Sequence, residues 1–186
     1  MLAETISLRH LLRENTSAAH AALEARVGLL NTQTEYNEYV RGLHAFRLNA
    51  ETWLATQGSH GEHEWRPHNI SDQLDKDIAD LALTTVAVHP VDWDATIGKS
   101  FAMGVHYVLE GSALGARVLC KRVASLGMHR THGARHLWAQ AESDSWRAFL
   151  GALLQHERRT DRTALIAGAS AAFLNAAACM ERAAHG

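Results

Sequence analysis

Residues 107–119 read YVLEGSALGARVL, and two glycines, Gly111 and Gly115, interrupt an otherwise good helical sequence. The helical pattern around them extends over about residues 94–126, with Gly98 near its start and a third interior glycine, Gly104. Each glycine inside a helix costs roughly 1 kcal/mol relative to alanine, so the three together cost about 3 kcal/mol. Their spacing of seven and four residues places them on one helix face. The pattern predicts that something approaches this backbone closely, either a second helix or a flat ligand.

The rest of the chain also has the character of an all-α protein. It has only 2 prolines among 186 residues and no alternating β-branched runs. Besides the glycine-bearing helix, we expect helices over about residues 7–27, 32–57, 71–81, 143–156 and 161–183. The segment after Gly127 is less regular. We therefore predict one compact domain, residues 1–186, of six or so helices.

Composition and charge exclude several classes of protein. With 18 Lys+Arg against 20 Asp+Glu, the net charge of −2 argues against a dedicated nucleic-acid binder. The only two cysteines, Cys120 and Cys179, provide no disulfide framework, which favours a reducing, cytoplasmic location. The charged N-terminus does not match a signal peptide. Residues 163–180 are uncharged, but their small residues and Asn175 indicate a core helix rather than a membrane span.

Thirteen histidines suggest metal binding, but their patterns are weak. Two groups can be recognised: a polar loop with His60, His63 and His68, and a trio at helical spacing, His129, His132 and His136. Gly127 and Gly133 interrupt the trio, and no cysteine or carboxylate completes a ligand set. We expect these histidines to lie on the surface. No di-iron Glu-x-x-His pair, nucleophile elbow or phosphate-binding loop occurs either.

Two segments resemble motifs of a known family. The segment from Tyr107 resembles the distal-helix signature of bacterial haem oxygenases, where an aromatic residue and an apolar pair precede a glycine-containing turn. Residues 11–27, LLRENTSAAHAALEARV, are similar to the family's proximal-helix motif. The segment around Trp146 and the last helix, which ends in CMER, are similar in a more generic way. The resemblance covers nearly the whole chain and implies a single-domain, all-α haem-oxygenase-like helical bundle.

The resemblance implies three residues on the proximal side of a bound haem. His20 would be the iron ligand, since a neutral imidazole on a rigid helix suits haem iron. Glu24 lies one turn further and would hold the other ring nitrogen, directly or through water. Arg13, two turns before His20, would pair with a haem propionate. The alternative for Arg13 is a solvated charge near the start of its helix.

On the distal side, the resemblance places Gly111, Ser112 and Gly115 at functional positions. The glycines would let the helix backbone lie over the haem. The chain departs from the family at two positions. Animal-type members carry an aspartate where this chain has Ser112, so its water network must differ. Ala116 stands where a second glycine is usual, which affects the expected regiochemistry more than the reaction.

The implied activity is that of a haem-degrading monooxygenase. Haem b would be both substrate and cofactor, and would react with O2 and electrons to give biliverdin, carbon monoxide and ferrous iron. The electrons would come from a separate reductase or ferredoxin-type donor. Lys121 and Arg122 could form its docking surface, although solvated charges are the simpler interpretation. Two alternatives stay open: a haem carrier or sensor without turnover, and a helical module whose glycine face packs on a partner.

Overall fold

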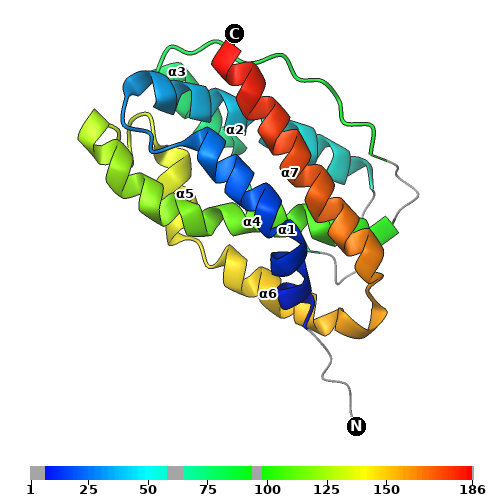
Figure 1. Cartoon of the computed structure of the whole chain (residues 1–186). Coiled ribbons are helices and arrows are strands. Elements are labelled where there is room, and N and C mark those ends of the chain that lie inside the picture. The colour runs from blue at the N-terminus through cyan, green and yellow to red at the C-terminus, as the bar shows by residue number, and fades with distance from the viewer. Residues whose placement is uncertain (1–6, 58–64, 94–97, 186) are drawn as a thin grey trace.

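The computed structural model describes residues 7–57, 65–93 and 98–185, and within these ranges the protein is all-α. Its helices are α1 (Leu8–Val27), α2 (Gln33–Thr56), α3 (Ser71–Asp80), α4 (Gly98–Val123), α5 (Arg135–Glu142), α6 (Ser145–Gln155) and α7 (Arg162–His185), with short 3-10 turns at Ala124–Leu126 and Glu157–Arg159. These helices share one hydrophobic core. The predicted fold class is confirmed, and Figure 1 shows α1 and α7 on the near side of the long helix α4.

Local capping residues mark the ends of the first two helices. Ser7 begins α1 by accepting a hydrogen bond from the backbone of His10, and Gly28 ends it with φ of +69°. Thr32 and Glu35 form a reciprocal capping box at the start of α2. Both signals consist of neighbouring residues, so they can be recognised without tertiary information.

Helix α5 is the element that the sequence does not reveal. Ala134 stands at its N-cap and offers no side-chain acceptor. Instead, the carboxylate of Asp77 on α3 accepts hydrogen bonds from the backbone N–H groups of Arg135 and His136, each at 3.0 Å. It also bonds His136 Nδ1 at 2.8 Å. Because the capping residue lies 58 positions away from Arg135, no local sequence pattern predicts where this helix begins.

Helix α7 packs against α1, α2 and α4. By length and composition it could cross a membrane, since its most apolar stretch has a mean hydropathy of 1.6. Of that stretch, 44% is buried inside the protein. Gly104 of α4 and Gly168 of α7 lie where the two helices cross. A Cβ on Gly104 would come within 2.1 Å of the Leu165 carbonyl oxygen.

The crossing corrects one expectation. Gly104, Gly111 and Gly115 were expected to face a common partner, but Gly104 contacts α7 whereas the other two lie on a cavity. Seven residues of helix span about 10 Å, enough for one face to meet different neighbours along its length. The two explanations of the glycines, helix packing and an open backbone, therefore apply to different glycines.

Candidate haem site

A cavity of about 710 Å³ lies on the second half of α4, between it and helices α1, α2 and α7. Its volume is within the range of about 300–1,000 Å³ usual for small-molecule sites. The cavity exists because α1 packs against α7 and α6 while making few contacts with α4. Its wall is mainly apolar, with Leu23, Leu43, Phe46, Val108, Leu119, Phe173 and Met180 among the lining residues.

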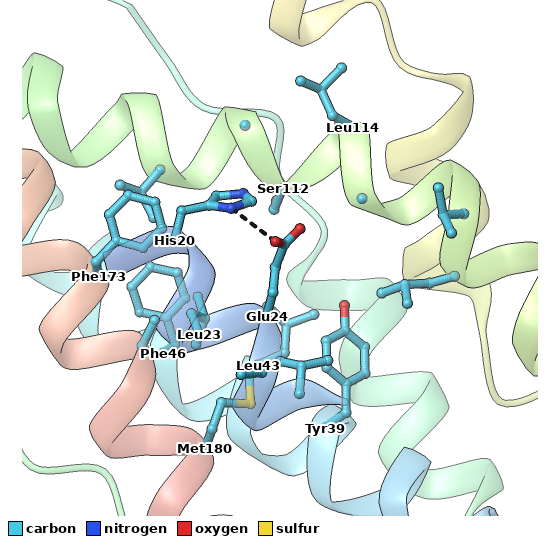
Figure 2. A pocket seen from close by; sticks show the side chains of 18 of the residues that line it. His20, Leu23, Glu24, Tyr39, Leu43, Phe46, Ser112, Leu114, Phe173 and Met180 are labelled. Atoms are coloured by element: carbon cyan, nitrogen blue, oxygen red, sulfur yellow. Dashed lines mark ion pairs between the residues drawn. The ribbon is translucent and has the colours of Figure 1, made fainter. Parts of the chain in front are cut away.

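His20 and Glu24 line the α1 side of this cavity as an interacting pair. His20 Nδ1 lies 3.4 Å from Glu24 Oε2, and both side chains are more than half exposed because the cavity is open. The His20 ring packs edge-on against Phe173 of α7, with ring centroids 5.9 Å apart. Figure 2 shows the imidazole projecting from α1 toward α4. With Nδ1 turned to the carboxylate, Nε2 is the nitrogen left to bind a ligand.

The facing wall is the bare backbone of α4 at Gly111 and Gly115, both of which line the cavity. Among the atoms that the structure describes, a Cβ built on Gly115 would meet none within 4 Å. One built on Gly111 would meet, in the same part of the chain, only the Trp146 ring, at 3.7 Å. No tight protein contact therefore requires glycine at either position, unlike at Gly104. What these glycines provide is a flat helix surface open to the cavity.

Ser112 also lines the cavity, and its hydroxyl is held on two sides. Its Oγ donates to the carbonyl oxygen of Leu109 at 2.6 Å. It accepts from Nε2 of Gln140 on α5, also at 2.6 Å. Gln140 is 4% exposed. The sequence did not reveal Gln140 as a site residue, because Gln140 lies on α5, the helix that no local signal predicts.

Arg13 is exposed and lies outside the cavity wall. Its charge nevertheless acts on Tyr107, which lines the cavity. Burial raises the pKa of Tyr107, while a hydrogen bond with Thr16 and the charges of Arg9 and Arg13 lower it. The positive charges of two arginines of α1 therefore act on the Tyr107 hydroxyl. Sequence reasoning used Tyr107 only as part of a motif, although an aromatic with a polar tip is a common wall residue of ligand sites.

Tyr39 of α2 was also missed by the sequence analysis. It lines the cavity, and Figure 2 shows its hydroxyl turned toward the same space as Glu24. Burial is the main cause that raises the pKa of this phenol well above its usual value, so Tyr39 stays protonated at neutral pH. A neutral hydroxyl can donate a hydrogen bond into the cavity.

The remaining histidines form no common site. His60 and His63 lie outside the described residues, and His68 uses its backbone groups to bond Glu110 and Arg47. His136 is fully buried against Asp77, so it is not a surface histidine as expected. His129 and His132 are exposed, as predicted. Across residues 7–57, 65–93 and 98–185, no group of three or more metal-binding side chains gathers.

Comparison with known proteins identifies the architecture. No protein-family model matches the chain. The structure is similar to that of the haem oxygenase from Neisseria meningitidis solved in NO- and CO-bound forms, with a TM-score of 0.74 over 97% of this chain and 94% of that one. Sequence identity between the two is 20%. The chain has the haem oxygenase fold.

A sequence relative supports the same grouping. Over 121 residues the chain is 35% identical to haem oxygenase PigA of Pseudomonas aeruginosa, a match that covers 60% of this chain. The match covers 58% of that protein, less than two thirds of its length. The resemblance to bacterial haem oxygenases read from the motifs is thus confirmed in sequence and in fold. Within that fold, the cavity between α1 and α4 brings together five of the six predicted site residues, all except Arg13.

Proposed function

We propose that this protein is a haem oxygenase that binds haem b in the cavity between α1 and α4. It converts haem, O2 and electrons into biliverdin, carbon monoxide and ferrous iron. The observation that carries the proposal is the pairing of two walls: His20, oriented by Glu24, on one side, and the open backbone of Gly111 and Gly115 on the other. A flat ligand with a metal at its centre needs a side chain that binds the metal on one side and an open surface against its other face.

The residues present fit haem in three respects. The imidazole of His20 has one nitrogen held by a carboxylate, as is usual for a histidine that ligates a metal. The glycine wall leaves room against the helix backbone that a larger side chain would fill. The mainly apolar lining suits the faces of a tetrapyrrole, and the arginines near Tyr107 suit its propionates.

Bound haem supplies the iron that activates O2 and the ring that is cleaved. The chain's own residues do the rest. His20 holds the group in place, and Glu24 keeps the proton on Nδ1 so that Nε2 can ligate. Once haem fills the open cavity, the apolar lining would keep bulk water from the faces of the ring. On the α4 side, Ser112 holds an ordered water without placing a strong acid there.

The proposed partner is an external electron donor, a reductase or a ferredoxin-type protein. Arg122 lies on the cavity wall and Lys121 is exposed beside it, so both could contribute a basic surface for an acidic donor. A cytoplasmic location, with no nucleic acid or membrane partner, fits the near-neutral charge and the absence of disulfides.

Hemin titration followed by visible spectroscopy tests the proposal. His20→Ala should abolish the spectrum of a histidine-ligated haem. His10→Ala is a matched control, because His10 also lies exposed on α1 with a glutamate one turn away, Glu14 at 3.1 Å. It is not on the cavity wall, so its variant should bind hemin normally.

Addition of a reductase and O2 to the hemin complex then separates the alternatives. Loss of the haem band with formation of a bile pigment supports the oxygenase. A stable complex that is reduced but never yields pigment would leave a carrier or sensor. No binding at all would exclude both and favour the third alternative, a helical module whose glycine face packs on a partner.

A further inference from the structure

The Ser112 hydroxyl sits where a side chain of α4 faces the haem cavity, and its hydrogen bonds decide what it can offer to that cavity. A serine hydroxyl has one proton to donate and two lone pairs that accept. Two of these three capacities are already used inside the protein, by Leu109 and by Gln140. The direction of each bond follows from the chemistry of the partners.

The hydrogen bond to Leu109 fixes the direction of the Ser112 hydroxyl proton. A backbone carbonyl oxygen can only accept, so Ser112 must donate its single proton to it across 2.6 Å. The same carbonyl oxygen also accepts from Nη1 of the buried Arg47, at 3.4 Å. The hydroxyl proton is therefore directed along the helix, away from any ligand in the cavity.

The Gln140 partner must then be a donor. Because the Ser112 proton is committed, the amide of Gln140 can bond Oγ only by presenting its NH2 group, which it does at 2.6 Å. This donation occupies one lone pair and ties α4 to α5. One lone pair of Oγ is left, and Ser112 lines the cavity.

We infer that Gln140 and the Leu109 carbonyl together fix the Ser112 hydroxyl as a hydrogen-bond acceptor toward the cavity. Gln140 acts through Ser112 and is a positioning residue. Ser112 cannot pass its proton directly to a ligand. Its oxygen accepts a hydrogen bond from a water molecule, and that water then has its second proton free to donate. The inference rests on the proposed function for its consequence, but the orientation can be tested without haem.

The first test measures the stability of the ligand-free protein. Gln140→Leu removes the donor, whereas Gln140→Glu replaces it with a carboxylate that has no N–H. Since Ser112 has no spare proton, the buried carboxyl must keep its own, and its pKa should rise. A raised pKa in the folded state means that stability falls as pH increases above the ordinary glutamate value.

We therefore expect Gln140→Glu to become progressively less stable than Gln140→Leu as denaturation is measured from pH 4 to pH 8. If Gln140→Glu is the more stable variant at pH 8, the hydroxyl turns freely to donate to residue 140, and the inference is wrong. Burial alone also raises the pKa of a carboxyl, so Gln140→Glu is compared with the same change in a Ser112→Ala background. A steeper loss of stability with pH in that background would mean that the hydroxyl had been donating to residue 140, and the inference would be wrong.

The second test uses the hemin complex and the pH at which its visible spectrum changes from the acid to the alkaline form. This change reports loss of a proton from water in the distal half of the cavity. An acceptor stabilises water over hydroxide, so Ser112→Ala should move the midpoint to lower pH, by about half a unit or more. A donating hydroxyl would stabilise hydroxide, and its removal would move the midpoint upward.

The outcomes separate this inference from the proposed function. A shift to higher pH, or no shift, in a Ser112→Ala variant that binds hemin normally overturns the inference and leaves haem binding intact. Failure of the wild type to bind hemin overturns the proposed function, and the comparison of the two Gln140 variants then decides the orientation by itself.

Discussion

Gly104 on α4 and Gly168 on α7 lie against each other's helix at a backbone-to-backbone crossing. A Cβ on Gly168 would be 2.0 Å from the Phe101 carbonyl oxygen, and one on Gly104 would be 2.1 Å from that of Leu165. Neither oxygen belongs to a flexible side chain that could move aside. The crossing seats α7 on α4 and so supports the first half of the helix whose second half forms the cavity.

The first prediction compares two glycines of α4. Gly104→Ala should destabilise the ligand-free protein by about 3 kcal/mol or more, because an added methyl group forces two backbones apart. Gly115→Ala should instead raise stability by up to about 1 kcal/mol through helix propensity, since no described atom lies within 4 Å of a Cβ built there. Thermal or urea denaturation measures both.

Hemin binding should also respond to the change at Gly115. Gly115→Ala narrows the cavity and should weaken hemin binding while the protein folds well. Normal hemin affinity in Gly115→Ala would show that the α4 backbone does not contact the ligand closely.

The second prediction concerns Glu24. Glu24→Gln keeps an acceptor near His20 Nδ1 but removes its charge, which should lower the affinity of the His20 site for haem roughly 10- to 100-fold. Stability of the ligand-free protein should change by less than about 0.5 kcal/mol, because the pair is exposed. Glu14→Gln, which alters the equivalent pair with His10, is the control and should leave hemin affinity unchanged.

The third prediction is a pH dependence from His106. This histidine is 6% exposed, and burial, assisted by the charge of Arg47, lowers its pKa to about 4. In the unfolded chain the imidazole takes up a proton at a pH of about 6.5, whereas in the folded protein it is still neutral at that pH. The contribution of His106 to stability is therefore complete above pH 6.5 and is lost as the pH falls toward 4. By linkage, the loss from pH 7.5 to 5 is about 2 kcal/mol from this residue.

His106→Phe should make the stability of the ligand-free protein less dependent on pH over this range. His136 contributes in the same direction, because burial lowers its pKa as well, so the variant should reduce the slope without abolishing it. Urea denaturation at several pH values gives the comparison. An unchanged slope in His106→Phe would mean that this imidazole accepts a proton in the folded protein.

The fourth prediction concerns Asp77. Asp77→Asn removes the charge that faces Arg135 and His136 and weakens the cap of α5, so the loss of stability should be about 3 kcal/mol. The matched control is Asp75→Asn on the same helix, where the side chain is 67% exposed and pairs with His44. That change should cost less than about 1 kcal/mol. Equal effects of the two substitutions would contradict the capping role of Asp77.

The sequence by itself determined the helical character of the chain, most helix ends and the two motifs that point to haem. These features are local: Ser7, Thr32 and Glu35 bond the backbone within three residues, and His20 reaches Glu24 across one helical turn. Interactions of such short range leave a readable spacing in the sequence.

Only the tertiary structure decided how the glycines divide and which residues support the site. Gly104 and Gly115 have the same local signature, and what approaches them depends on where α7 crosses α4. Asp77 begins α5 from 58 residues away, and Gln140, carried by α5, reaches Ser112 across 28 residues of chain. Contacts at such separations arise from packing, and no spacing rule along one helix encodes them.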